Sequence, residues 1–175
     1  MIIGVPEELK DNEFRVSIAP PGINELVESG HKVLVQSLAG KGSGYSDKEY
    51  TNSGAIIINS IEEIYKQSEM IVKVKEPLEK EYSLIKEDQI IFTYLHLSSN
   101  KKLTQALIDS KSICIAYETI EKNGNFTLLA PMSEVAGRIS AIVRAYYLGI
   151  NFHGQGLLIS GVSGVLIVFK NMVFF

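Results

Sequence analysis

The amino-acid sequence predicts an α/β protein whose strands form a parallel, doubly wound sheet. Short runs rich in Ile and Val alternate with segments of helical periodicity, and this alternation is typical of parallel strands joined by helices. The strand-like runs are apolar almost throughout, as expected when helices cover both faces of a sheet. The length agrees, because 175 residues provide one sizeable core, or one domain and part of another.

The predicted strands follow one another at short spacing. Each is a brief run of apolar, mostly β-branched residues, a composition that favours strands. In chain order they cover residues 2–5, 32–36, 55–58, 71–77, 90–97 and 112–116. The dipeptide Asn123-Gly124 lies between two extended segments and predicts a tight hairpin turn.

Helix signals fill the gaps between these strands. A Pro-Pro pair opens the first helix and Gly30 ends it, whereas Ser46 and Asn100 are candidate N-caps of later helices. The expected helices cover residues 20–30, 46–54, 61–67, 79–86 and 100–109. The longest helical pattern follows Pro131 and would connect the first domain to further structure.

Composition excludes several classes of function. The net charge of −3 argues against a nucleic-acid partner, because such proteins carry a clustered basic face. The single cysteine, Cys114, cannot form an intramolecular disulfide and fits a reducing compartment. The N-terminus has no signal-peptide pattern, and polar residues interrupt the apolar tail, 157–175, before it reaches the ~20 residues of a membrane span. We therefore expect a cytoplasmic protein with no membrane partner. We also expect no metal site, because no His, Cys or carboxylate pair has ligand spacing.

Cationic side chains follow three of the apolar runs. Lys75 and His96 lie at the ends of two predicted strands, and Arg15 follows the first strand in the polar stretch KDNEFR. Ligands of open α/β sheets bind outside the carboxyl ends of the strands, so these residues would meet at one crevice. Together they suggest a carboxylate ligand and a proton carrier. The alternative is that each is an ordinary solvated side chain.

Two further motifs have both a structural and a functional interpretation. The glycine-rich stretch 39–45 matches neither the Walker sequence nor the dinucleotide fingerprint, so we expect a flexible loop beside the crevice. Ser133 and Glu134 follow a proline and resemble a capped helix N-terminus. Free N–H groups and a hydroxyl at such a position can also bind a phosphate or another polar cofactor group, although composition alone favours the cap.

These residues belong to a longer resemblance. The stretch GVPEELKDNEFRVSIAPPGINELVESGHKVLVQSLAG, followed by GSGYSDKEY, VKVKEP, TYLHL and PMSEVAGR, resembles the N-terminal domain of alanine dehydrogenases. A similar domain occurs in nicotinamide nucleotide transhydrogenases. The likeness covers about the first 160 residues, nearly in register. The transhydrogenase domain keeps the N-E-x-R motif but lacks the T-Y-L-H histidine, so His96 favours alanine dehydrogenase.

The resemblance implies a fold, a reaction and a set of site residues. The fold is Rossmann-like, and the reaction is the NAD-linked oxidative deamination of L-alanine to pyruvate and ammonium, with its reverse. Arg15 would hold the substrate carboxylate and Lys75 would bind the substrate as a second cation. His96 would be the catalytic acid/base and Ser133 would contact NAD. Family members are hexamers, so the resemblance also implies a homo-oligomer.

The final segment departs from the family pattern. The likeness persists to GVSGV and then dissolves into LIVFKNMVFF, without the glycine-rich dinucleotide turn, the ribose-binding acid or the catalytic aspartate of a second domain. We interpret residues 1–130 as the substrate domain and 131–175 as a connecting helix and the incomplete start of an NAD-binding domain. The chain would then be truncated, inactive alone and compromised as an oligomer. The alternatives are a transhydrogenase-type nucleotide-binding domain, or a non-catalytic fragment of a decaying gene.

Overall fold

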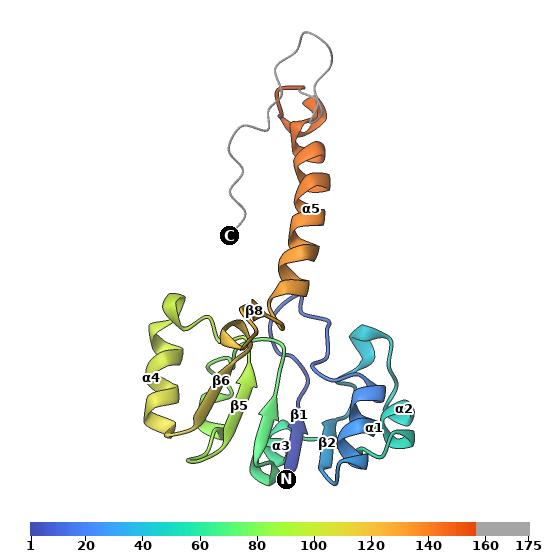
Figure 1. Cartoon of the computed structure of the whole chain (residues 1–175), viewed down its shortest axis with the longest axis vertical. Helices are drawn as coiled ribbons and strands as arrows, with labels where there is room; N and C mark the ends of the chain where they lie inside the picture. The colour runs from blue at the N-terminus through green and yellow to red at the C-terminus, as the bar shows by residue number, and fades with distance from the viewer. Residues whose placement is uncertain (157–175) are drawn as a thin grey trace. The chain divides into compact units, whose positions relative to one another are not determined.

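In the computed structural model, which describes residues 1–156, the first part of the chain forms a parallel six-stranded sheet (Figure 1). Its strands are β1 (Ile2–Val5), β2 (Lys32–Gln36), β3 (Ile56–Ile58), β4 (Met70–Val72), β5 (Ile90–Thr93) and β6 (Ile113–Ala116). Their order is β3-β2-β1-β4-β5-β6, so the winding of the chain reverses between β1 and β4. The predicted fold class, a parallel, doubly wound, Rossmann-like sheet, is confirmed.

Four helices connect the strands and begin close to their predicted starts. They are α1 (Pro20–Glu28), α2 (Asp47–Asn52), α3 (Ile61–Gln67) and α4 (Lys101–Ser110). Side-chain caps fix three of the starts. Ser46 forms a capping box with Glu49, and the side chains of Ser60 and Asn100 each accept a hydrogen bond from the first turn of their helix.

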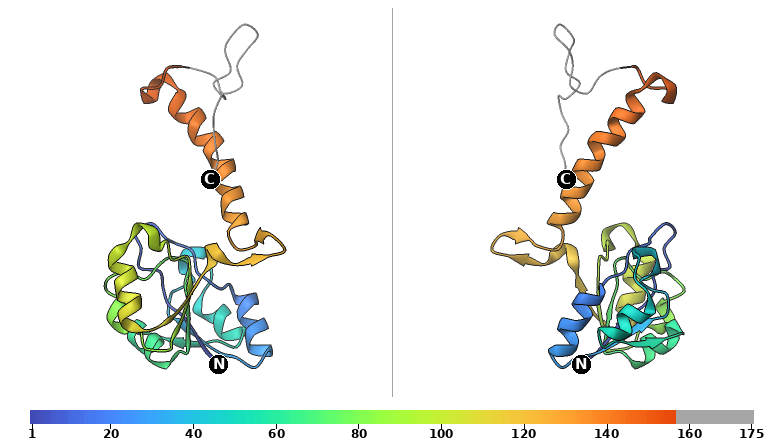
Figure 2. Two further views of the ribbon diagram at one scale, coloured as in Figure 1. Left: turned by 60° about the vertical axis from the view of Figure 1, so that its left-hand side comes forward. Right: turned by 90° about the vertical axis from the view of Figure 1, so that its right-hand side faces the viewer.

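Helices cover both faces of the sheet (Figure 2). The core consists of two apolar clusters, one on each face. Val33 and Val35 pack in the cluster that includes residues of α1 and α2, whereas Leu34 packs in the cluster that includes residues of α3 and α4. This alternation follows from the period of two along a strand. Gly4 allows β1 to approach α3 closely, because a Cβ there would lie 2.4 Å from Ser68 Oγ and 2.8 Å from Ile64 Cγ2.

Two predicted strands are too long. The predictions of strands at 71–77 and 90–97 are corrected by β4 and β5, which end at Val72 and Thr93. Lys75 and His96 therefore lie in the segments that follow these strands.

The predicted helix at 79–86 is wrong, because a short 3-10 turn takes its place. The side chain of Glu81 is fully buried and turned toward the protein interior, where its carboxylate accepts the N–H of Leu78. This arrangement is incompatible with a solvent-facing helix. The 3-10 turns of the described chain are Lys41–Ser43, Tyr82–Leu84, Leu97–Ser99, Tyr117–Thr119 and Ile150–Phe152.

The chain divides into two compact units, Met1–Thr119 and the residues from Ile120 onward. In the second unit, β7 (Glu121–Lys122) and β8 (Asn125–Phe126) form the predicted hairpin, whose turn has positive φ at Asn123 and Gly124. The long helix α5 (Ala130–Leu148) follows. The assignment of residues 131–175 to part of an NAD-binding domain remains a prediction.

The predicted cap at Ser133 is wrong. Helix α5 begins at Ala130, and the Ser133 N–H donates to the Leu129 carbonyl at 3.1 Å inside the first turn. Pro131 explains the earlier start, because proline has no N–H to satisfy and is tolerated in the first turn of a helix.

The apolar tail, 157–175, in which the sequence predicts no membrane span, lies outside the described residues. Within residues 1–156, no helix combines the length and the apolar composition that crossing a membrane requires.

Candidate functional site

The three predicted cationic residues lie on segments that leave neighbouring strands at the same edge of the sheet. Arg15 lies after β1, Lys75 after β4 and His96 after β5, and these strands are adjacent. The carboxyl ends of adjacent parallel strands meet at one edge, and β1 and β4 flank the point where the winding reverses. The topology therefore brings Arg15, Lys75 and His96 to the position where open α/β sheets bind ligands.

Arg15 is held by a carboxylate two residues earlier in the chain. Its Nε donates to Glu13 Oε1 at 2.7 Å and its Nη2 to Glu13 Oε2 at 2.6 Å, which makes a bidentate, side-on pair. The hydrogen bonds from Arg15 hold the pKa of Glu13 below its ordinary value, although burial opposes this shift. The guanidinium is thus fixed in one orientation while 45% of its side chain stays exposed.

Lys75 is positioned through its backbone. Its N–H donates to Glu8 Oε2 at 3.3 Å, the neighbouring Val74 N–H donates to Glu8 Oε1 at 2.6 Å, and its carbonyl accepts the Thr93 hydroxyl at 2.9 Å. These bonds tie the segment after β4 to the segment after β1 and to the end of β5. The charge of Lys75 contributes to the lowered pKa of Glu13, so both predicted substrate-binding cations act on the same carboxylate.

His96 lies in a turn that a carboxylate stabilises. Its backbone is left-handed, with φ 48° and ψ 39°, a conformation that costs energy for a residue with a side chain. Glu118 offsets this cost, since its carboxylate accepts the N–H of His96 at 2.8 Å and the N–H of Leu95 at 3.1 Å. The imidazole of this exposed residue stacks on Tyr94, with ring centroids 6.1 Å apart.

Electrostatic effects connect the predicted site residues to one another. Burial raises the pKa of Tyr94, and the charge of Arg15 opposes that rise. Burial likewise acts to raise the pKa of Glu76, but a hydrogen bond from Lys10 and the charge of His96 contribute to holding it below its usual value. The pKa of Tyr94 is therefore affected by the charge of Arg15, and its ring stacks against His96.

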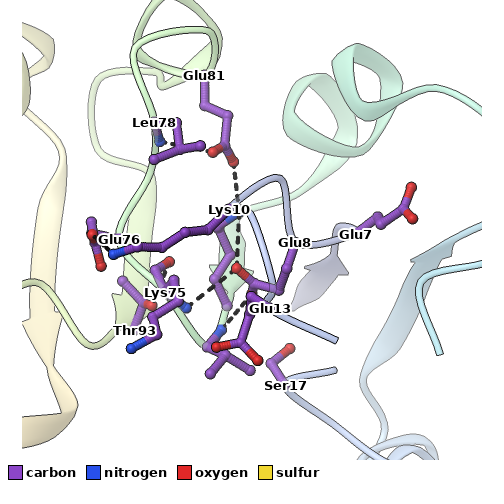
Figure 3. Close-up of polar contacts among 12 residues, drawn as sticks. Glu7, Glu8, Lys10, Glu13, Ser17, Lys75, Glu76, Leu78, Glu81 and Thr93 are labelled. Carbon is purple, nitrogen blue, oxygen red and sulfur yellow. Dashed lines mark hydrogen bonds and ion pairs between the residues drawn. The ribbon is translucent and has the colours of Figure 1, made fainter. Parts of the chain in front are cut away.

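A buried ion network lies beside this edge (Figure 3). The Lys73 side chain is 1% exposed, and its Nζ donates to Glu81 Oε1 at 2.8 Å and lies 3.6 Å from Glu8 Oε2. The Tyr65 hydroxyl donates to the same Glu81 oxygen at 2.9 Å, and the Leu78 N–H donates to the other at 2.8 Å. Burial raises the pKa of Glu8, and the charge of Lys73 opposes this rise.

Sequence reasoning missed Glu8, Lys73 and Glu81. The available signal was the position of Lys73 inside the apolar run I-V-K-V, because a lysine in a buried segment requires carboxylate partners. No comparable signal marks Glu81, because its segment, 79–86, has the sequence pattern of a helix.

A cavity of about 360 Å³ opens beside Arg15. It is lined by Glu7, Glu8, Glu13, Phe14, Arg15, Leu38, Ala39, Lys41 and Gly42, and so contains neither Lys75 nor His96. The glycine-rich stretch 39–45 forms one wall through its 3-10 turn. Gly42 is required there, because a Cβ would lie 2.5 Å from the Phe14 carbonyl oxygen.

Ser133 lies on α5 in the second unit, apart in the chain from the other candidates. Its N–H is already bonded to Leu129, so this amide is not available to a cofactor phosphate, and only the hydroxyl of an exposed residue remains. Within residues 1–156, no group of three or more His, Cys, Asp and Glu side chains is arranged to hold a metal ion.

The fold defines a class of protein: a Rossmann-type α/β domain, here with an arginine, a lysine and a histidine on segments at one edge of its sheet. Comparison with known proteins agrees. Residues 4–136 match the family described as "Alanine dehydrogenase/PNT, N-terminal domain", and the chain belongs to this family.

Several curated relatives are alanine dehydrogenases. The chain is 48% identical over 166 residues to the alanine dehydrogenase of Mycolicibacterium smegmatis, covering 94% of this chain and 45% of the relative. It is 49% identical to that of Methanococcus maripaludis, again over 94% of this chain and 44% of the relative. The chain therefore spans less than half the length of the relatives that it matches.

Solved structures show the same relationship. A structure of L-alanine dehydrogenase superposes with a TM-score of 0.82 at 45% identity, covering 95% of this chain and 46% of that one. The transhydrogenase from Sinorhizobium meliloti superposes with a TM-score of 0.74 at 24% identity, covering 84% of this chain and 42% of that one. The second similarity shows a shared fold.

Proposed function

We propose that this chain provides the substrate-binding and proton-transfer residues of an NAD-dependent alanine dehydrogenase. The reaction converts L-alanine, NAD⁺ and water to pyruvate, ammonium, NADH and a proton. The observation that carries the proposal is the arrangement of Arg15, Lys75 and His96 on segments after three adjacent strands, at the reversal point of the sheet. The identity of 48% to a named alanine dehydrogenase supports it.

Each residue has a chemical task in this proposal. Arg15 binds the substrate carboxylate through N–H groups oriented by its pairing with Glu13, and Lys75 adds a second positive charge. His96 exchanges protons with the reacting nitrogen and with water, because imidazole changes its charge near neutral pH. Its exposed ring, stacked on Tyr94, lies on a segment at the same sheet edge as Arg15.

The described residues do not by themselves fit NAD. Ser133 is the one residue that the family resemblance assigns to the cofactor, and a single exposed hydroxyl cannot hold a dinucleotide. We therefore propose that the chain alone has little dehydrogenase activity and that groups beyond those described hold the nicotinamide. Cytoplasmic location and assembly into hexamers remain parts of this proposal.

The proposal is tested by titrating the full chain with pyruvate and following the NMR spectrum of the protein. We expect saturable shifts in the wild-type chain that weaken at least about tenfold in Arg15→Ala and Lys75→Ala, since each loses a charged hydrogen-bond donor. Lys66→Ala is the matched control, because Lys66 is 75% exposed on α3. A wild-type chain that ignores pyruvate would exclude the proposal and favour a transhydrogenase-type domain.

A further inference from the structure

Glu13 is built into the candidate site as a fixed counter-charge. Besides its bidentate pair with the guanidinium, its carboxylate accepts the backbone N–H of Arg15 at 3.1 Å. Its side chain is 8% exposed, whereas that of Arg15 is 45% exposed. A nearly buried carboxylate with three bonds to one residue belongs to the site and is costly for a ligand to displace.

The charges around Glu13 can be counted residue by residue. Arg15 and Lys75 both act on it. Glu8 is engaged by the N–H groups of Val74 and Lys75 and by the ammonium group of Lys73, so its charge belongs to the buried network.

Other charged residues near the site are balanced in sign. Glu76 is paired with Lys10, and Glu7 and Lys41, both exposed on the cavity wall, carry opposite charges. Glu118 is engaged by the N–H of His96. The charges of Arg15, Lys75 and Glu13 together sum to about +1, which one monocarboxylate neutralises.

We propose that Glu13 is the specificity-determining residue that restricts the Arg15–Lys75 site to ligands with a single carboxylate. The inference rests on the proposed function, since it assumes that this site binds the substrate carboxylate. A dicarboxylate would bring a second negative charge into a partly desolvated site that already contains Glu13, while the charges of Arg15 and Lys75 are already shared between Glu13 and the first carboxylate. Without the Glu13 charge, the net charge rises to about +2 and a second carboxylate gains a partner.

The test compares pyruvate with malonate, a three-carbon dicarboxylate, by isothermal titration calorimetry on the full chain at pH 7.5 and low salt. Glu13→Gln is expected to shift the ratio of the two dissociation constants about tenfold in favour of malonate. Glu13→Asp retains the charge and is expected to keep the wild-type preference. Glu63→Gln, at an exposed carboxylate on α3 that pairs with Lys66, is the matched control and should leave the ratio unchanged.

The outcomes separate the inference from the proposed function. Pyruvate binding to the wild-type chain with an unchanged ratio in Glu13→Gln overturns the role of Glu13 and leaves the carboxylate site standing. A wild-type chain that binds neither ligand overturns both. If Glu13→Gln fails to fold, Glu13→Asp decides, because loss of the monocarboxylate preference in a variant that keeps the charge contradicts the inference.

Discussion

Replacing Glu81 with alanine tests how strongly the buried network stabilises the fold. The substitution removes the acceptor of the Lys73 ammonium, the Tyr65 hydroxyl and the Leu78 N–H. Lys73, 1% exposed, then retains only Glu8 at 3.6 Å within the described network. Breaking a buried ion pair from one side costs about 3–5 kcal/mol, because an uncompensated charge stays buried. Each buried donor left unpaired costs about 1–3 kcal/mol, and these contributions overlap. We expect Glu81→Ala to lower the free energy of unfolding by about 4 kcal/mol.

Urea unfolding of the full chain at pH 7, followed by far-UV circular dichroism, measures this loss. Glu79→Ala is the matched control, because Glu79 pairs with Lys102 on the surface, where the two side chains are 68% and 79% exposed. It should change the free energy of unfolding by less than about 1 kcal/mol. The double change Lys73→Met with Glu81→Leu removes both charges and should cost less than Glu81→Ala. A loss below about 1 kcal/mol for Glu81→Ala, or a larger loss for the double variant, would refute the reasoning.

Four further predictions use the same unfolding measurement. Asn100→Ala removes the N-cap of α4 and should cost about 1 kcal/mol, whereas Asn100→Asp keeps the acceptor and should cost less. Gly42→Ala forces a Cβ against the Phe14 carbonyl and should cost about 1–3 kcal/mol. Gly137→Ala, in open space on α5, should be neutral or stabilising. The lowered pKa of Glu13 means that its stabilising effect is present above the pKa of the unfolded state and is lost as pH falls through the folded-state pKa. The free energy of unfolding of Glu13→Gln should therefore fall less steeply below pH 4.5 than that of the wild-type chain. The same fall in both proteins would contradict this.

Much of the fold could be predicted because its signals are local. Apolar runs separated by helical segments predict the strands and their parallel arrangement. Ser46 and Asn100 mark helix starts, because a capping oxygen lies just before the first turn of a helix. The hairpin at Asn123-Gly124 was predictable for the same reason, since both residues adopt positive φ.

The errors arose where long-range contacts override local pattern. The segment 79–86 has the periodicity of a helix. The structure instead has a 3-10 turn there, because Glu81 is buried in an ion pair with Lys73. The lengths of β4 and β5 depended on pairing with neighbouring strands, which a single sequence does not display. Sheet topology places the segments that carry Arg15, Lys75 and His96 at one edge, and the shared role of these residues stays a prediction. The pairing of Glu13 with Arg15 required coordinates.

Lys73 and Lys75 lie just after the end of β4 and have different environments. Lys73 belongs to the buried ion network, whereas Lys75 lies at the candidate site. In a continuous strand, Lys73 and Lys75 would lie on the same face of the sheet, because residues two apart share a face. Strand β4 ends at Val72, before both lysines. Lys73 then becomes enclosed by Glu8 and Glu81, while the charge of Lys75 acts on Glu13 at the candidate site. One carboxylate joins the two environments, since Glu8 lies beside the Lys73 ammonium and accepts the Lys75 N–H. The network that stabilises the core therefore also sets the position of the Lys75 backbone. Glu81→Ala should weaken pyruvate binding even under conditions where the variant remains folded, and unchanged binding in the folded variant would show that stability and ligand binding are independent.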